Sequence, residues 1–265
     1  MTLAFASAPV GAILAASALA LALLPARNEL AHELARERAA SRAAVERALP
    51  LMQHSATVWS REMACFSCHH QGLGALAVGL ARERGFEPDE AAFQAELDAA
   101  RERSRVRYEP LLVCDGVGIF GRALTLVALG AGGRPRDDVS DALSHFVAAR
   151  QMVSGAWASN EHRPPIEDSA VSATAWSVRA LSAYGPEGRG EEMRGRVTAA
   201  RGWLAAVEPR DGEEQSLQLL GLAWAGTSDA ELAPRAAALA AAQREDGGWA
   251  QLPTLASDAY ATGQA

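Results

Sequence analysis

The sequence contains no lysine, so all 25 of its cationic side chains are arginines. Catalysis through a lysine Schiff base or a phosphate-loop lysine is therefore excluded. Aromatic residues make up only 6% of the chain, which argues against a pocket walled by many aromatic rings. The 32 acidic residues give a net charge of −7, and the arginines form no basic run. Such a chain is not expected to bind nucleic acid through its phosphates.

The chain has enough apolar residues for a sizeable buried core. Hydrophobic residues account for 49% of the 265 residues and charged residues for 22%, which excludes a disordered or low-complexity protein. The length fits one large domain or two small ones. No stretch alternates polar and apolar residues for long enough to predict a strand, so an all-α protein is expected.

The first 26 residues are interpreted as a targeting segment. Residues 3–24 carry no charge. As a helix this stretch would span about 33 Å, enough for a bilayer core of about 30 Å. No arginine precedes it, unlike in a standard signal peptide, although small residues at 18–22 could serve for cleavage; a buried alanine-rich helix is the alternative. We expect a signal peptide or membrane anchor in residues 1–26, a linker or helix in 27–44, and an exported, periplasmic or extracytoplasmic protein.

Pairs of helices are expected to organise residues 45–265. Apolar stretches that end near a glycine recur with a period of about 45 residues, and an amphipathic stretch precedes each of them. Glycine, proline and aspartate stand at the joins, where helices should stop. The glycine-terminated stretches are 76–85, 123–132, 173–185, 217–226 and an incomplete one from 258, and their partners are 45–54, 90–103, 139–150, 194–207 and 231–243.

A glutamine precedes a tryptophan by six residues three times, and in the last two copies a glycine stands two residues before the tryptophan. A glutamine at a helix C-terminus can bond unpaired carbonyls, glycine supplies the turn, and tryptophan covers the start of the next helix. The pattern therefore predicts a structural tie between neighbouring repeats. The pairs are Gln53 and Trp59, Gln151 and Trp157, and Gln243 and Trp249.

The Gln-x-x-x-Gly-x-Trp pattern at residues 151–157 and 243–249 resembles the QW motif of squalene–hopene cyclases and prenyltransferase-type α/α toroids. Residues 257–264 also resemble an inner-helix start in bacterial proteins of that repeat family. The resemblance covers residues 45–265 and implies inner and outer helix rings around a central cavity. A fifth inner helix only begins before Ala265. Either the chain is a fragment, or the ring is incomplete and a partner or self-association covers its open end.

The resemblance does not settle an activity. Class II cyclases of the family use an Asp-x-Asp-Asp acid, which is absent here, and the zinc triad of prenyltransferases cannot be assembled. Glu167 and Asp168 stand where a helix should begin, as does the Asp-Asp-x-x-Asp pattern at 137–141, which is typical of magnesium–diphosphate sites. Acids are expected at helix starts in any case. A terpenoid cyclase or prenyltransferase-like enzyme using the toroid cavity is therefore the rival hypothesis, and enzymatic activity is left open.

Residues 65–69 have the sequence Cys-Phe-Ser-Cys-His, the attachment pattern of c-type haem. Two thiols at this spacing add to the porphyrin vinyl groups, and the adjacent histidine reaches the iron as proximal ligand. The pattern suits an exported chain, because haem attachment belongs outside the cytosol. Residues 65–71 also resemble the segment that opens the first inner helix in cytochrome-like bacterial toroid proteins. We expect Cys65 and Cys68 to anchor a haem c and His69 to bind its iron.

Two other interpretations of this segment stay open. A structural zinc site would combine Cys65, Cys68, Cys114 and either His69 or His70, although Cys114 lies one repeat away and is otherwise expected to be a small buried residue. A disulfide between Cys65 and Cys68 is the other, without the βαβ context of thioredoxins. In either case the protein would be a non-catalytic scaffold.

A haem at this segment would need a sixth iron ligand or leave that position open. A methionine ligand suits electron transfer, whereas an open position allows ligand binding or peroxidase-like chemistry. Met63 or His54 is the first candidate for the distal ligand. Met52, His145, Met152 and His162 are further candidates. We therefore predict a membrane-tethered toroid protein in electron transfer or haem-based sensing, with an unidentified redox partner.

Overall fold

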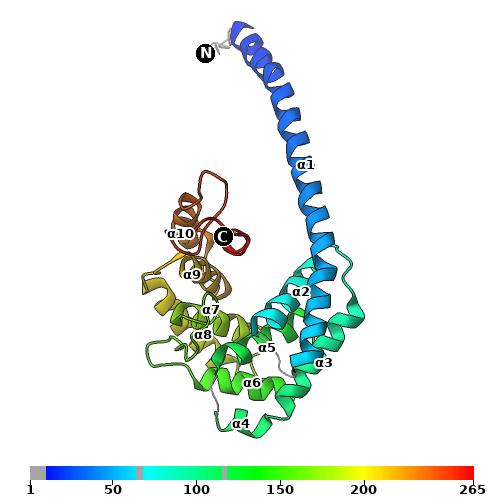
Figure 1. Ribbon diagram of the computed structural model, residues 1–265. Helices are drawn as coiled ribbons and strands as arrows, with labels where there is room; N and C mark the ends of the chain where they lie inside the picture. Colours follow the sequence, from blue (N-terminus) through cyan, green and yellow to red (C-terminus); the bar gives the residue numbers. More distant parts are fainter. Residues whose placement is uncertain (1–9, 64–67, 115–117) are drawn as a thin grey trace, which may run out of the picture. The chain divides into compact units, whose positions relative to one another are not determined.

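The computed structural model describes residues 10–63, 68–114 and 118–265, without the side chains of residues 10–28, 30, 68 and 69. Within those ranges the protein contains eleven α-helices, one π-helix and no strand (Figure 1). The prediction of an all-α protein is therefore confirmed. The chain divides into two compact units, Met1–Leu51 and Met52–Ala265.

The first unit consists of the longer part of α1 (Val10–Met63), which continues into the second unit. Nearly all of its described side chains are exposed, and Arg42 and Glu46 form an ion pair of 3.0 Å on its surface. The helices whose side chains are described include none that is long and apolar enough to cross a membrane. Residues 3–24 lie outside that part of the chain, so the membrane anchor stays a prediction.

The second unit holds the predicted helix pairs. The glycine-terminated stretches correspond to α2, α5, α7 and α9, and the amphipathic stretches to the end of α1 and to α3, α6, α8 and α10. Apart from α1, which extends far beyond the predicted stretch 45–54, each helix lies within a few residues of its expected place. The bounds are η1 Cys68–Leu73, α2 Gly74–Glu83, α3 Glu90–Arg105, α4 Tyr108–Leu112, α5 Ile119–Ala131, α6 Asp138–Ala149, α7 Ala170–Ala183, α8 Gly190–Ala206, α9 Gly212–Trp224, α10 Asp229–Ala241 and α11 Ala259–Gln264.

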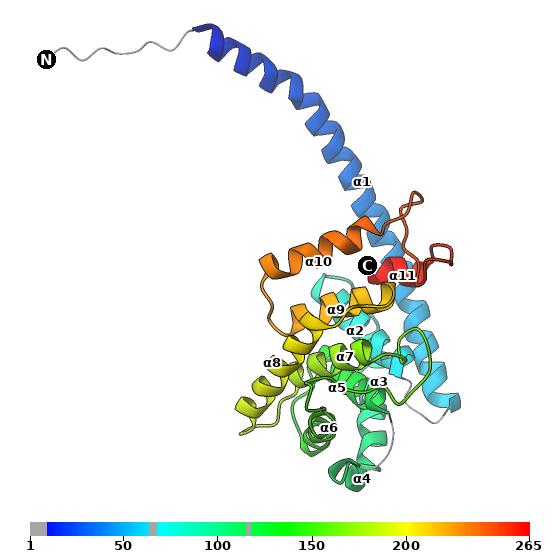
Figure 2. The same cartoon turned by 90° about the vertical axis from the view of Figure 1, so that its left-hand side faces the viewer.

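The helices that end near a glycine pack on one another in chain order, from η1 and α2 through α5, α7 and α9 to α11 (Figures 1 and 2). Each of α6, α8 and α10 packs against the next or preceding member of that series. α5 is apolar on most of its surface, with Arg122 as its one charged residue, and its Phe120, Leu124 and Leu126 are fully buried. Helices that are hydrophobic all round lie in the interior of a protein. The core of the second unit therefore follows α5 and α7.

Acids mark helix starts, as predicted. Asp137, Asp211 and Asp258 each accept a hydrogen bond from the backbone N–H three residues on and cap α6, α9 and α11. Such caps contribute about 1 kcal/mol each. Although burial acts in the opposite direction, the N–H of Ser140 and the guanidinium of Arg101 hold the pKa of Asp137 below its usual value.

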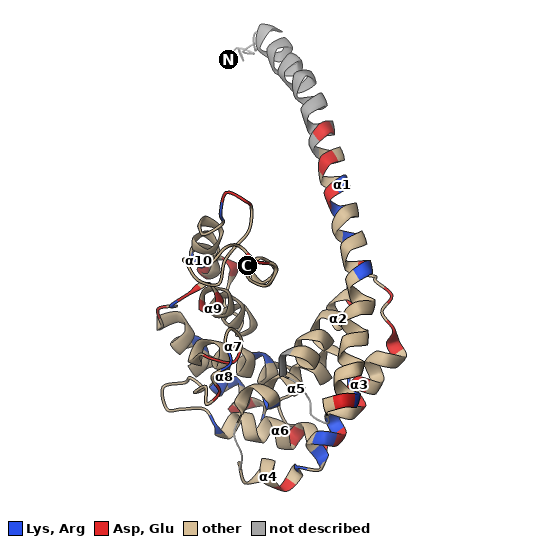
Figure 3. Cartoon of the chain, viewed as in Figure 1, with Lys and Arg blue, Asp and Glu red and all other residues tan. Residues whose placement is uncertain are grey.

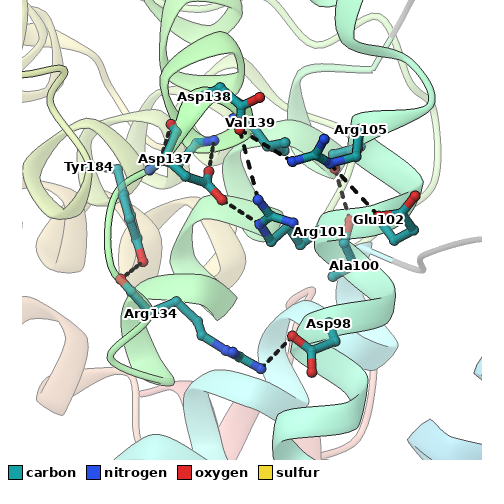
Figure 4. A network of polar contacts seen from close by, with 12 residues as sticks. Asp98, Ala100, Arg101, Glu102, Arg105, Arg134, Asp137, Asp138, Val139 and Tyr184 are labelled. Carbon is teal, nitrogen blue, oxygen red and sulfur yellow. Dashed lines mark hydrogen bonds and ion pairs between the residues drawn. The ribbon is translucent and has the colours of Figure 1, made fainter.

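The Asp-Asp-x-x-Asp pattern is therefore part of a helix cap rather than an assembled magnesium site. Figure 4 shows the guanidinium of Arg101 against both Asp137 and Asp138. Arg105 also approaches Asp138, at 3.7 Å. Figure 3 shows acidic and basic residues gathered together near the C-terminal end of α3, where these arginines lie. The first two carboxylates of this pattern, Asp137 and Asp138, already have cationic partners.

The two full glutamine–tryptophan motifs have the same geometry. Trp157 is fully buried, its indole N–H donates to the carbonyl of Val147 (2.6 Å), and its backbone N–H donates to Oγ1 of Thr174 (3.0 Å). Trp249 repeats both bonds, to the carbonyl of Leu239 (2.8 Å) and to Oγ1 of Thr262 (3.0 Å). Each tryptophan thus ties the preceding helix to the following one, as predicted.

The glutamines act differently from the prediction. Nε2 of Gln151 donates to the carbonyl of Gly155, and Nε2 of Gln243 to that of Gly247, both at 2.8 Å. Each glutamine therefore stabilises the turn. The carbonyl of the preceding helix accepts its hydrogen bond from the tryptophan instead. The prediction that Gln53 and Trp59 form a third such motif is wrong, because both residues lie inside α1 and no turn separates them.

Candidate functional site

The Cys-x-x-Cys-His segment follows α1 in the sequence, and its last two residues belong to η1. Cys65 and its neighbours at 64–67 lie outside the described residues. The backbone of Cys68 and His69 opens the π-helix η1, but their side chains are not described. π-Turns are rare and occur frequently at functional sites. Haem attachment, zinc binding and a disulfide all remain predictions for these three residues.

The position of η1 follows from how η1 and α2 pack on α5. A Cβ atom on Gly72 would lie 2.8 Å from Cβ of Leu124, and one on Gly79 would lie 2.8 Å from the carbonyl oxygen of Ala131. The members of both pairs are 52 residues apart (124 − 72 and 131 − 79). The segment formed by η1 and α2 therefore runs parallel to α5 in constant register. This register places the backbone of Cys68 level with the start of α5.

A buried polar network fastens η1 to α1 and α3. Gln71 is 2% exposed, and its Nε2 donates to Oε2 of Glu96 (2.8 Å) and to Oγ of Ser60 (2.5 Å). Ser60 Oγ donates to the same carboxylate oxygen at 2.7 Å, and Arg103 donates to the carbonyl of Ser60 at 2.7 Å. The sequence analysis missed this network. Its only signal was a glutamine next to the histidines at the head of an apolar stretch.

His70 faces the last turns of α1. Its Nε2 lies 2.9 Å from Oγ of Ser55, and its ring centroid lies 5.4 Å from that of Trp59. The imidazole of His70 is thus engaged by a hydroxyl and an aromatic ring of one helix.

A small cavity lies between α1, α2 and α3. Its volume is about 20 Å³, and Met52, Gln53, Gln71, Phe93 and Glu96 are among its lining residues. That volume holds about one water molecule. Met52 is accordingly a packing residue, and no prosthetic group fits in this place.

The loop before α7 covers the start of α5. Oε1 of Glu161 lies 2.5 Å from the place that a Cβ atom on Gly118 would take, so only glycine admits this carboxyl. Burial, and then the charge of Glu167, raises the pKa of Glu161. Glu167 is 1% exposed and forms an ion pair with Arg163. Glu167 therefore anchors the loop, and Ser169 rather than Glu167 or Asp168 provides the N-cap of α7.

The same loop carries an aspartate–histidine pair. Nδ1 of His162 is hydrogen-bonded to Oδ1 of Asp168, directly before the N-cap of α7. The His162 side chain is 87% exposed, whereas that of Asp168 is only 26% exposed. A carboxylate on Nδ1 fixes the ring orientation and leaves Nε2 as the free nitrogen. The pair presents an oriented imidazole at the surface.

The other candidate distal ligands have different surroundings. Met63 is 52% exposed at the end of α1, two residues before Cys65 in the sequence. His54 is exposed nine residues earlier on the same helix, about 13 Å away along its axis. His145 is engaged by the carbonyl of Leu112 at 3.1 Å, and Met152 is 43% exposed after α6.

Cys114 is not the buried residue that the sequence predicted. It is half-exposed, has a φ of 54° and is not part of a disulfide. Its Sγ lies 3.9 Å from Nε2 of His145. No group of three or more metal-binding side chains is found among the described residues, which exclude the side chains of Cys65, Cys68 and His69. The zinc interpretation therefore stays a prediction.

A second buried acid lies at the start of α9. Glu213 is 6% exposed, and its Oε1 accepts hydrogen bonds from the Tyr260 hydroxyl (3.0 Å) and from Nε2 of Gln264 (3.2 Å), both on α11. Burial raises the pKa of Glu213 to about 7. Because the folded chain keeps this proton to a higher pH than the unfolded chain does, Glu213 couples stability to pH.

We expect the free energy of unfolding to fall by on the order of 2 kcal/mol as the pH rises from about 4.5 to about 7, relative to a Glu213→Gln variant. The contribution is complete below the unfolded pKa and is lost as pH rises through the folded pKa. Urea unfolding of both proteins at several pH values measures the difference. Parallel profiles would show that Glu213 ionises as freely in the folded chain as in the unfolded one.

Comparisons with models of known families, with curated proteins and with solved structures find no significant match for this chain. The resemblance to toroid proteins is therefore not supported by any of these comparisons.

Proposed function

We propose that this chain is an exported protein that carries one covalent c-type haem on Cys65 and Cys68, with His69 as proximal ligand, and that acts in electron transfer or haem-based sensing. The observation that carries the proposal is the Cys-x-x-Cys-His sequence at the head of η1. A redox partner and a membrane tether through residues 3–24 belong to the same proposal.

The donor set fits a c-type haem. Two thiols separated by two residues and followed by an imidazole satisfy the attachment pattern, and such a haem supplies one-electron chemistry when bound. His70 is engaged by Ser55 and Trp59, which leaves His69 for the iron. The Gln71 network anchors the same turn to two helices. His70 and Gln71 thus hold the π-helix η1 against α1 and α3.

For the fold, we propose an α/α toroid of the squalene–hopene cyclase and prenyltransferase type. Two features support it: the two QW turns have the same hydrogen bonds, and the helices α2, α5, α7, α9 and α11 pack in chain order. In this proposal the toroid is a frame for the haem. A cyclase-like enzyme remains the rival, to be pursued if haem is absent.

The test is the reduced-pyridine absorption spectrum of full-length protein, exported in a host that matures c-type cytochromes. We expect a haem c band that survives denaturation, because thioether bonds do not break on unfolding. A Cys65→Ser/Cys68→Ser variant is expected to lose the band completely.

A Cys114→Ser variant is the matched control, since it removes the remaining cysteine. Unchanged haem content in this control would exclude a Cys114 ligand. Folded, exported protein without haem would overturn the proposal. Zinc analysis of that protein would then separate a structural metal from a disulfide.

A further inference from the structure

We infer that Glu213 is a pH-sensitive switch: its protonated carboxyl holds α11 against α9, and loss of the proton releases α11 while the other helices stay folded. This inference does not depend on the proposed haem function. It concerns a local opening of one helix, which is distinct from the unfolding of the whole chain.

The first step is the attachment of α11 to α9, which lie side by side (Figure 2). Ala261 is the one residue of α11 that is buried, and so small a side chain contributes little apolar stabilisation. Tyr260 and Gln264 both donate hydrogen bonds to Oε1 of Glu213. Among the described residues, no other side chain of α9 is hydrogen-bonded to α11. The polar attachment of α11 to α9 therefore depends on a single carboxyl group.

The second step is the state of that carboxyl group. Glu213 is 6% exposed, and its Oε2 is buried without a hydrogen-bond partner among the described residues. A carboxylate with a buried, unpaired oxygen is costly, because its charge has lost water and gained nothing in return. Burial accordingly raises the pKa of Glu213 to about 7, although the bonds from Gln264 and Tyr260 act in the opposite direction. The contact with α11 therefore favours the neutral acid.

The helices around Glu213 supply no cation that would stabilise its charged form. α9 packs against α7, α8, α10 and α11. Among the described residues, no charged group of α7, α8 or α10 acts on Glu213, and the negative charge of Asp211 raises its pKa further. The neighbouring Glu214 is paired with Arg210 at 2.7 Å. Ionisation of Glu213 is therefore uncompensated while α11 stays in place.

The titratable groups of α11 keep their charge near neutral pH. Burial, and then the charge of Glu213, raises the pKa of the Tyr260 hydroxyl, so this group stays protonated. The backbone N–H of Ala261 holds the pKa of Asp258 below its usual value, so this carboxylate stays ionised. Glu213 is therefore the group at this contact whose charge changes between mildly acidic and mildly alkaline solution.

A second contact of α11 does not change with pH. The backbone N–H of Trp249 donates to Oγ1 of Thr262 at 3.0 Å, and the N–H of Asp258 donates to the carbonyl of Trp249 at 3.1 Å. These bonds join α11 to its own QW turn and not to α9. We expect them to keep α11 beside that turn when the contact with Glu213 is lost, so that the opening stays local.

The direction of the switch follows from proton linkage. With α11 in place the pKa of Glu213 is about 7, whereas a released, solvated carboxyl returns to its ordinary value of 4.5. The proton therefore stabilises the attached state, fully below the lower pKa, and this stabilisation is lost as pH rises through the higher one. Between about pH 5.5 and about pH 8 the attachment of α11 should weaken on the order of 30-fold.

The test is amide hydrogen exchange of the full-length chain, measured by mass spectrometry at about pH 5.5 and about pH 8 and corrected for the intrinsic pH dependence of exchange. Peptides that span α11 should lose protection on the order of 30-fold at the higher pH. Peptides of α5 should remain far better protected than those of α11 at both pH values, because α5 lies in the core.

Glu213→Gln removes the charge and keeps an oxygen that accepts the same two hydrogen bonds. We expect its α11 to have the same protection at both pH values. Glu231→Gln is the matched control, because Glu231 is an exposed acid at the start of α10 whose carboxylate is bonded to Ser228. This control should keep the pH dependence of the wild-type chain. Tyr260→Phe removes one donor to Glu213 and should lower the protection of α11 already at about pH 5.5.

A loss of protection that occurs in the wild-type chain and in Glu231→Gln but not in Glu213→Gln would establish the switch. The same loss in Glu213→Gln would overturn the inference, as would α11 protection that is independent of pH in the wild-type chain. Equal protection of α11 and α5 would also overturn it, because α11 would then open only when the whole chain unfolds. If Glu213→Gln does not fold, unaltered α11 protection in Tyr260→Phe overturns the inference by itself.

Discussion

Replacing Trp157 by alanine is expected to lower the free energy of unfolding by about 3–5 kcal/mol. The indole is fully buried, and its N–H bonds the carbonyl of Val147 at 2.6 Å. The substitution removes the largest buried side chain of the loop before α7, leaves a cavity and strands that carbonyl without its donor. Urea unfolding followed by far-UV circular dichroism measures the loss.

Trp249 offers a matched control within the same chain. Its indole makes the equivalent bond to Leu239 at 2.8 Å, but the side chain is only half-buried. Trp249→Ala should therefore cost about 1–2 kcal/mol, since the hydrogen bond is lost with little cavity. Equal losses at the two positions would contradict the assignment of the difference to burial.

Replacing Gly155 by alanine is expected to cost about 2–5 kcal/mol. Its φ of 93° is unfavourable for any residue with a Cβ atom, which accounts for about 1–2 kcal/mol. The new Cβ would also lie 2.5 Å from the carbonyl oxygen of Ala199, a backbone atom of α8 that cannot move alone. Overpacking of this kind typically costs about 1–3 kcal/mol more.

Gly247 separates the two causes. It occupies the same place in the second QW turn, with a φ of 81°, but has nothing within 4 Å of its Cβ direction. Gly247→Ala should show the backbone cost alone, about 1–2 kcal/mol. Thermal or urea unfolding of both variants gives the difference, and a larger loss at Gly247 than at Gly155 would refute the role of the α8 contact.

The helix pairs could be predicted because their signals are local. Apolar spacing, glycines near helix ends and acids at several helix starts report on neighbouring residues only, and Asp137, Asp211 and Asp258 do cap α6, α9 and α11. The structural role of the Asp-Asp-x-x-Asp pattern followed from the same reasoning. The exposure of Cys114 did not, because burial depends on helices distant in the sequence.

Much of the candidate site could not be predicted from local sequence patterns. Gln71 bonds Ser60 and Glu96, which lie 11 and 25 residues away, and Glu161 lies against Gly118, 43 residues earlier (161 − 118). No spacing rule brings such residues together, since the packing of successive helices decides which side chains meet. His162 was one of six distal-ligand candidates by residue type, and only the structure shows its hydrogen bond to Asp168.

The sequence by itself determined the helical class, the two QW turns and the Cys-x-x-Cys-His segment, because each depends on residues within one or two turns of chain. Only the tertiary structure decided that η1 runs in register beside α5, that Trp157 is buried while Trp249 is half-exposed, and that the loop before α7 covers the start of α5. These facts depend on how close two helix backbones approach, and that distance is set by pairs of residues far apart along the chain.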